Sequence, residues 1–307
     1  MVAAELSRRA ADCLMEGNLR AAEALQIEAV AILRNSTPNV ELDLASALNL
    51  LGEVYRKSGR WQKAESALGQ ALRLFDRSPE RRDAELVSVL CSLGSLSHSR
   101  QNYEQAERMF TRAAAIWKAC CSADALGFAK ILNNMAAAKA GLGSHRQAAD
   151  LYPRAITLYE QALGPNDPIL AGVLNNFALV QTDRGDSAKA EELYQKAVAI
   201  WERAGNPNHP DYAFVLGNYG ALLAKKRQYQ DADQRYRQAL PILRSCCGDN
   251  HVEFARRLAD HAYVLRELGR KEEAMSSAAR AAAILKNRPP ADADSLTVDI
   301  RDLQWKH

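Results

Sequence analysis

The sequence predicts an all-α fold, an α-solenoid of seven helix–turn–helix repeats, and three observations support this prediction. The stretch Leu174–Trp201 reads as two amphipathic helices, and similar stretches recur every 42 residues toward both ends of the chain. A glycine marks the turn in most repeats, and small and large apolar residues recur at fixed distances from that turn. Internal periods of roughly 20 to 50 residues are typical of solenoids, in which each repeat covers the apolar face of its neighbour.

Four columns of residues define the two helices of each repeat. In the first helix a leucine is followed four residues later by alanine or glycine, and residues at this spacing share one helix face. In the second helix two alanines lie seven residues apart, so they leave a smooth stripe against which another helix can pack closely. The columns begin at Leu6, Ala10, Ala22 and Ala29, and they recur without exception through Leu258, Ala262, Ala274 and Ala281.

The turns carry residues that are suited to helix ends. Asn, Ser and Asp are preferred N-caps, and proline suits the first turn of a helix because its φ is fixed and it has no N–H to leave unbonded. The turn glycines are Gly17, Gly59, Gly143, Gly185 and Gly269, with Gln101 and Arg227 in the two remaining repeats. The expected N-caps within repeats are Asn18, Asn102, Ser144 and Asp186, and between repeats Pro168 and Pro210 follow Asp167 and His209.

This pattern of a small residue and two alanines around a helix–turn–helix resembles the tetratricopeptide repeat. The long period, the Leu-Asn-Asn-x-Ala elements at Leu132–Ala136 and Leu174–Ala178, and the turn Gly164–Pro168 are similar to the variety found in kinesin light chains and many bacterial proteins. The resemblance covers about residues 1–287. It implies a right-handed solenoid in which the first helices line a concave groove and the second helices form the convex side.

We expect one continuous solenoid over residues 1–287, followed by a linker and C-terminal tail over residues 288–307. The tail begins with a Pro-, Ala- and Asp-rich stretch that is typical of a linker. Leu296, Val298 and Ile300 then alternate with polar residues, which is the period of a strand. Such a segment could cover the open end of the last repeat, fray in solvent, or bind a partner as a strand.

Composition limits the classes of partner. The net charge of +3 over 307 residues gives no reason to expect a nucleic-acid partner, and the expected groove has few aromatic side chains for base stacking. No apolar run approaches the roughly 18 residues of a membrane span, and the N-terminus lacks the apolar core of a signal peptide. We therefore expect a soluble, cytoplasmic protein that has no membrane partner.

The sequence contains no recognisable catalytic or metal-binding motif. A phosphate-binding loop, a His-Glu-x-x-His element and a Gly-x-Ser-x-Gly elbow are all missing. Cys91 and His98 share a helix face, but seven residues of helix separate them by about 10 Å, which is too far for a nucleophile and its base. The adjacent acids Glu191 and Glu192 are interpreted as a solvated face. The sequence thus predicts a protein that is not an enzyme and uses no cofactor or metal.

Two pairs of adjacent cysteines occupy the same place in the repeat. Cys120–Cys121 and Cys246–Cys247 are three periods apart, each at the end of a second helix. Adjacent cysteines lack the spacing of common zinc and redox motifs. The six cysteines therefore predict no disulfide framework, and these pairs are expected to fill helix ends, with a thiol sensor or a soft-metal site as the alternative.

The first helices carry the candidate binding surface. If the leucine and small columns face inward, the opposite side of each first helix presents amides, cations and a few apolar residues. Asparagine offers both hydrogen-bond donors and acceptors, so a row of amides can hold the backbone of an extended peptide. The predicted groove residues are Asn49, Arg56, Lys130, Asn133, Asn134, Asn175, Asn176, Leu179, Phe214, Asn218, Arg256, Tyr263 and Arg266.

These residues predict a non-enzymatic scaffold that binds a peptide or disordered segment of a partner protein. Lys130, Arg256 and Arg266 would select acidic side chains, while Leu179 and Phe214 would hold an apolar anchor, in keeping with the acidic motifs that the resemblance to kinesin light chains implies. A different interpretation of the amides is that they bridge adjacent first helices. A different function would be a ligand-responsive sensor within a larger signalling complex.

Overall fold

The computed structural model describes residues 2–36, 40–78, 80, 82–120 and 124–286. The predicted strand in the tail lies outside the described residues. The chain divides into two compact units, Met1–Gly143 (unit 1) and Ser144–His307 (unit 2). The boundary falls at the turn inside the fourth repeat, and the prediction of one continuous solenoid stays a prediction.

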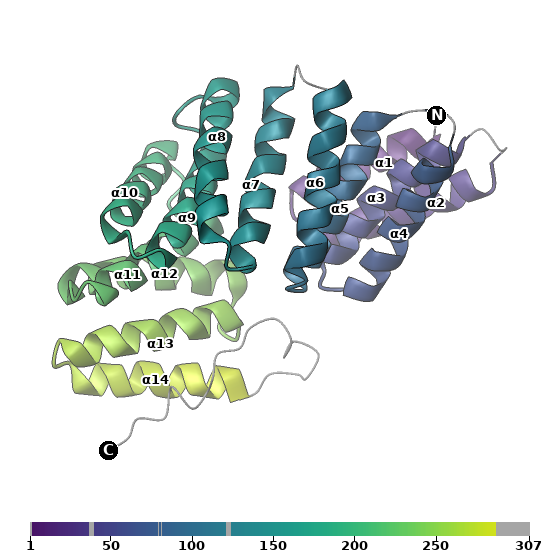
Figure 1. The fold of residues 1–307 in the computed structure, drawn as a ribbon. Coiled ribbons are helices and arrows are strands. Elements are labelled where there is room, and N and C mark those ends of the chain that lie inside the picture. The colour runs from purple at the N-terminus through teal and green to yellow at the C-terminus, as the bar shows by residue number, and fades with distance from the viewer. Residues whose placement is uncertain (1, 37–39, 79, 81, 121–123, 287–307) are drawn as a thin grey trace. The chain divides into compact units, whose positions relative to one another are not determined.

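The described part of the chain folds into fourteen helices and contains no strand, which confirms the all-α repeat class (Figure 1). Consecutive helices form the first and second helix of each predicted repeat. Unit 1 contains α1 (Val2–Met15), α2 (Leu19–Arg34), α3 (Glu41–Lys57), α4 (Trp61–Arg77), α5 (Asp83–Ser99), α6 (Tyr103–Cys120) and α7 (Ala125–Gly141). Unit 2 contains α8 (His145–Leu163), α9 (Pro168–Asp183), α10 (Ser187–Ala204), α11 (Pro210–Lys225), α12 (Tyr229–Cys247), α13 (Val252–Glu267) and α14 (Lys271–Lys286).

The small residues of the first helices make room for large residues of the second helices. A Cβ atom added at Gly52 would lie 2.5 Å from Cγ of Leu68, and one added at Gly94 would lie 2.6 Å from the ring of Phe110. The alanine columns of the second helices are buried in all seven repeats. Because the helices approach so closely, neither column leaves space for a larger side chain.

The turn inside each repeat takes a left-handed backbone conformation. Gly185 has φ of 83°, and the two residues that replace glycine in this column, Gln101 and Arg227, have φ of 59° and 61°. Only glycine adopts this conformation without steric cost. The turn geometry is therefore imposed by the packing of the two helices even where the sequence opposes it.

The predicted helix caps are mostly confirmed. The side chains of Asn18, Asn102 and Asp186 accept a hydrogen bond from the backbone N–H three residues later. Ser144 stands at the N-cap of α8 but makes no such side-chain bond. Pro168 and Pro210 begin α9 and α11 as expected.

Ion pairs connect successive repeats in a regular way that the sequence interpretation missed. A carboxylate next to the first alanine column of one repeat meets a cation of the following repeat. Glu191 pairs with Lys226 and accepts a hydrogen bond from Tyr219, so the prediction that it lies on a solvated face is wrong. The other ion pairs that use this acid position are Glu23–Arg60 at 2.6 Å, Glu65–Arg100 at 2.6 Å, Glu107–Lys139 at 2.5 Å and Asp233–Arg270 at 3.0 Å.

Candidate functional site

A chain of hydrogen bonds joins the three first helices α9, α11 and α13 of unit 2. Nδ2 of Asn218 donates to Oδ1 of Asn175 across 2.9 Å, and a guanidinium nitrogen of Arg257 donates to Oδ1 of Asn218 across 2.6 Å. Within α9, Nδ2 of Asn175 donates to Oδ1 of Asn176 across 3.4 Å. Asn175 and Asn218 therefore do bridge adjacent first helices, as the alternative interpretation of the amides anticipated.

Arg257 is the member of this network that sequence reasoning did not find. Its side chain is 4% exposed, and its charge is balanced by Glu253 at 2.9 Å and Asp260 at 3.4 Å. Gly217 leaves room for it, because a Cβ atom there would lie 2.7 Å from Nε of Arg257. A buried cation is tolerated only when it is paired in this way.

The sequence does contain a signal for Arg257. Counted in steps of 42 residues, its column holds aliphatic residues in the three preceding repeats, and all three are buried, so an arginine at this position predicts a buried charge that needs partners. The glycine at position 217, where the two preceding repeats have asparagine, is a second sign. The aliphatic residues of this column are Ile131, Val173 and Val215.

Other predicted groove residues of unit 2 remain accessible. Leu179 and Tyr263 are 40% and 37% exposed, which is unusual for side chains of their size in this protein. The guanidinium of Arg266 lies 5.3 Å from the centre of the Tyr263 ring, a cation–π contact that fixes both groups. Arg256 is partly exposed and 3.8 Å from Glu253. Phe214 is half-buried.

In unit 1, the predicted residues behave in three ways. Asn49 donates to Oγ of Ser88 across 3.0 Å and so bridges α3 and α5. Arg56 forms an ion pair with Glu53 on its own helix at 2.8 Å. Asn133 and Asn134 bond to each other at 3.1 Å, and Lys130 is exposed. The assignment of these residues, and of those in unit 2, to a peptide-binding groove stays a prediction.

A buried histidine lies beside the network in unit 2. Nε2 of His261 is 2.6 Å from Oδ1 of Asp233, which also pairs with Arg237 at 2.9 Å and Arg270 at 3.0 Å. Burial lowers the pKa of His261 below its ordinary value. Burial alone would raise the pKa of Asp233, but hydrogen bonds from His261 and Arg237 lower it overall. The neutral imidazole is favoured chiefly because burial penalises the charged ring, and the nearby cations Arg237 and Arg270 add to this against the effect of Asp233, which reduces the net shift in pKa.

The described cysteines differ in burial and in bonding. Burial raises the pKa of the Cys91 thiol to about 12, so it is protonated and unreactive at neutral pH. Cys246 and Cys247 are free thiols with sulfur atoms 3.2 Å apart at the end of α12. Cys120 is disulfide-bonded, contrary to the expectation of simple packing at that position, and Cys121 lies outside the described residues.

Solved structures of other proteins share this fold. The apo form of RapI has a TM-score of 0.70 at 15% identity, over 93% of this chain and 98% of that chain. NprR in complex with its cognate peptide NprX has a TM-score of 0.66 at 14% identity, over 94% and 80%. Nearly identical TPR-like repeats of a putative kinesin light chain from Podospora anserina have a TM-score of 0.54 at 18% identity, over 64% and 95%.

Within the described residues, none of the helices is both long and apolar enough to span a bilayer. No curated protein matches the sequence. The tetratricopeptide repeat model, in contrast, matches residues 43–119, 127–202 and 170–245, which together make up more than half of the chain. The chain belongs to the tetratricopeptide repeat family.

Proposed function

We propose that the first helices of unit 2 bind an extended peptide or disordered segment of a partner protein. The repeat family to which the chain belongs is an interaction module, so a scaffold for protein partners is its general role. The proposed contact residues are termed the Asn218 surface: Asn176, Leu179, Asn218, Arg256, Tyr263 and Arg266.

The fixed orientation of Asn218 is the observation that carries this proposal. Arginine has only donors, so the Asn218 group that meets Arg257 must be the carbonyl oxygen. The amide nitrogen then faces Asn175, and this contact uses one of its two N–H groups. The second N–H remains to donate to a backbone carbonyl of a peptide, and its direction is set before the peptide arrives. Preorganised donors of this kind lower the entropic cost of binding.

The neighbouring side chains support an acidic segment with an apolar residue. Leu179 and Tyr263 offer apolar surface that is already partly in solvent. Arg256 and Arg266 are each about two-fifths exposed and supply positive charge near that surface. The NprR structure contains a peptide, and its similar fold makes a peptide a reasonable class of ligand for this chain.

Unit 1 is proposed to carry a peptide-binding surface of its own. Asn49 and Asn133 each have a carbonyl oxygen that is buried and has no hydrogen-bond partner within the described residues. Asn134, Lys130 and Arg56 complete the set predicted from the sequence. Their role is a separate proposal that concerns unit 1 alone.

Selection from a random peptide library displayed on phage tests this proposal. We expect the full chain to enrich segments that place a large apolar residue beside Asp or Glu. Leu179→Asp removes the apolar anchor and Arg266→Glu removes the charge. Each should raise the Kd of the selected peptide about tenfold or more, since contacts of this kind contribute roughly 1 to 2 kcal/mol each. Lys196→Glu, on the exposed side of α10, serves as the matched charge control.

The comparison with the control decides between specific and general attraction. If Lys196→Glu weakens binding of the peptide as much as Arg266→Glu does, the loss of affinity comes from long-range electrostatic attraction. The Asn218 surface is then not the binding site. If the selected peptides show no acidic bias, the charge preference is wrong.

A further inference from the structure

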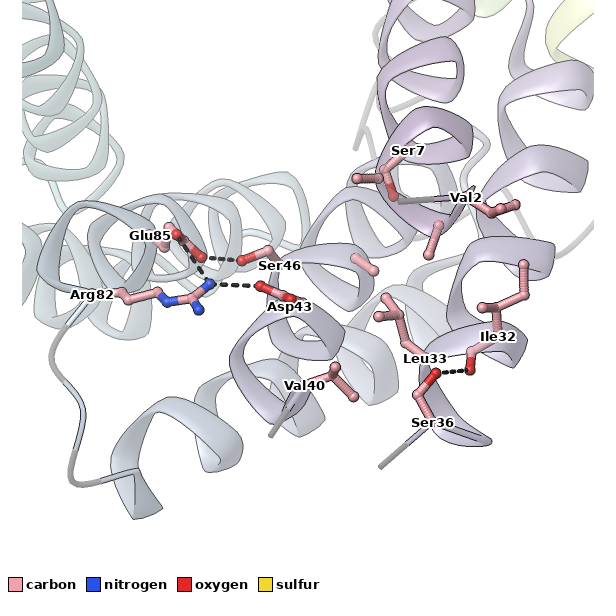
Figure 2. A pocket seen from close by; sticks show the side chains of 13 residues that line it. Val2, Ser7, Ile32, Leu33, Ser36, Val40, Asp43, Ser46, Arg82 and Glu85 are labelled. Carbon is pink, nitrogen blue, oxygen red and sulfur yellow. Dashed lines mark hydrogen bonds and ion pairs between the residues drawn. The ribbon is translucent and has the colours of Figure 1, made fainter. Parts of the chain in front are cut away.

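A pocket of about 720 Å³ lies among the helix ends of the first three repeats in unit 1 (Figure 2). This volume is within the range of sites that hold small ligands or a few side chains. The pocket has two unlike walls. Val2, Ile32 and Leu33 give an apolar wall from α1 and α2, and Asp43 of α3, Glu85 of α5 and the N-cap residue Arg82 give a charged wall.

The charged wall carries more negative than positive charge. Arg82 is placed between two carboxylates, 2.7 Å from Oδ1 of Asp43 and 3.7 Å from Oε1 of Glu85. Glu80 also approaches its Nε at 3.4 Å. One guanidinium therefore faces three carboxylates. Because the side chains of Asp43 and Glu85 remain 51% and 41% exposed, they can accept hydrogen bonds from a further cation.

The repeat explains why the two carboxylates are neighbours. Asp43 and Glu85 occupy the same position in successive repeats, in the first turns of α3 and α5. Ser46 of α3 reinforces this arrangement, because its hydroxyl donates to Oε2 of Glu85. The wall is thus held by contacts between repeats and does not depend on a ligand for its shape.

The apolar wall is incompletely covered. Val2 is 65% exposed although it lines the pocket, and it is among the most exposed large apolar residues of the described chain. Ala4, on the same helix, is also exposed. An apolar group that entered the pocket would remove this surface from water, which favours binding in proportion to the area covered.

We propose that this pocket, termed the α1–α3 pocket, binds a short peptide segment in which a bulky apolar side chain adjoins a lysine or arginine. The apolar side chain lies against Val2, Ile32 and Leu33, and the cation pairs with Asp43 and Glu85. This site goes beyond the peptide-binding proposal for unit 2, because it uses other residues and prefers the opposite charge. The test of this pocket does not depend on the outcome for the Asn218 surface.

Methyl NMR of the full chain tests this proposal with short probe peptides. The probes are blocked tetrapeptides of sequence Gly-Leu-Lys-Gly, Gly-Leu-Glu-Gly and Gly-Ala-Lys-Gly. We expect the lysine–leucine peptide to shift the methyl signals of Val2, Ile32, Leu33 and Val40. Its Kd should be about threefold tighter than that of the glutamate peptide, because an exposed ion pair with Asp43 and Glu85 favours lysine modestly and the same carboxylates repel glutamate. The alanine peptide should bind more weakly than the leucine peptide.

Two variants separate the charged wall from the apolar wall. The double variant Asp43→Asn, Glu85→Gln should abolish the preference for lysine over glutamate, whereas Glu104→Gln, an exposed carboxyl in the first turn of α6, should leave it unchanged. Ala4→Trp should fill the pocket and weaken binding of the lysine–leucine peptide about tenfold. Ala4 is exposed, so this substitution does not disturb the core.

Three outcomes would overturn the proposal. The first is that the pocket methyl signals do not respond to the peptide. The second is equal binding of the lysine and glutamate peptides by the wild-type chain. The third is a shift of the same methyl signals with protein concentration in the absence of peptide, which would identify a second copy of the chain as the occupant. Failure of the unit 2 proposal would change none of these readouts.

Discussion

At the scale of single residues, the buried guanidinium of Arg257 dominates the stability of the network in unit 2. Arg257→Ala would leave Glu253, itself 9% exposed, without its closest partner. We expect a loss of about 3 kcal/mol, the usual consequence of breaking a buried ion pair on one side. The midpoint of urea unfolding measures this loss. Arg256→Ala, one residue away, removes only a partly exposed contact to the same Glu253 at 3.8 Å, so it should lower the midpoint much less.

His261 gives the stability of unit 2 a dependence on pH. Its folded-state pKa is lowered by burial, so the unfolded chain binds a proton at a higher pH than the folded chain does. Stability is therefore complete above the ordinary histidine pKa and falls as the pH drops below it, by at most about 1.4 kcal/mol per pH unit. His261→Phe, which copies Phe177 at the same repeat position, should flatten the decline in Tm between pH 7 and pH 5. Parallel Tm curves for the two proteins would show that His261 does not titrate on unfolding.

Asp233 adds a second acid-sensitive contribution at lower pH. Its pKa is lowered overall by the hydrogen bonds from His261 and Arg237, against the effect of burial. A carboxylate with a lowered pKa stabilises the fold above its ordinary pKa and loses that contribution on further acidification. The His261→Phe variant removes one of these hydrogen bonds, so its decline below about pH 4, where the carboxyl titrates, should be smaller than in the wild-type chain.

At the scale of the repeat element, the turn is where sequence and structure disagree. Gln101 and Arg227 hold a left-handed conformation that costs a residue with a side chain about 1 kcal/mol. Arg227→Gly should therefore raise Tm by a few degrees, because the strain is relieved. Gln228→Gly, at the next residue with φ of −87°, should lower Tm instead, since glycine there only adds freedom to the unfolded chain. Equal effects of the two substitutions would contradict the strain argument.

The alanine columns determine how closely neighbouring helices pack. Ala190 and Ala197 are both completely buried, so Ala190→Leu or Ala197→Leu should destabilise the protein by about 1–3 kcal/mol through overpacking. Thermal unfolding followed by circular dichroism measures the change. Glu192→Ala removes only exposed ion pairs to Lys189 and Lys196 and should leave Tm almost unchanged. If both kinds of substitution shift Tm equally, the packing contacts do not limit the stability.

At the scale of the whole chain, the sequence predicts what repeats and misses what departs from the repeat. The burial of the leucine, small and alanine columns can be predicted from periodicity alone, because these residues pack between helices in the same way in every repeat. Arg257 breaks an aliphatic column, and its partner Asn218 comes from the first helix of the preceding repeat, so no pattern within one repeat predicts their contact. For the same reason, the sequence does not show whether Asn175 is free to bind a ligand or is bonded to Asn218, as the structure has it.

The inter-repeat ion pairs have a consequence for how such a chain changes length. Each acid lies in one repeat and its cation in the next, so an in-frame duplication or loss of 42 residues regenerates the same pair at the new junction. A gene encoding this pattern can gain or lose whole repeats in one recombination event without leaving an unpaired charge at the seam. The fourth repeat is the exception, because Ala149 stands at the acid position and offers no carboxylate to the cation of a new neighbour. Variation in repeat number among descendants should therefore concentrate in multiples of this length.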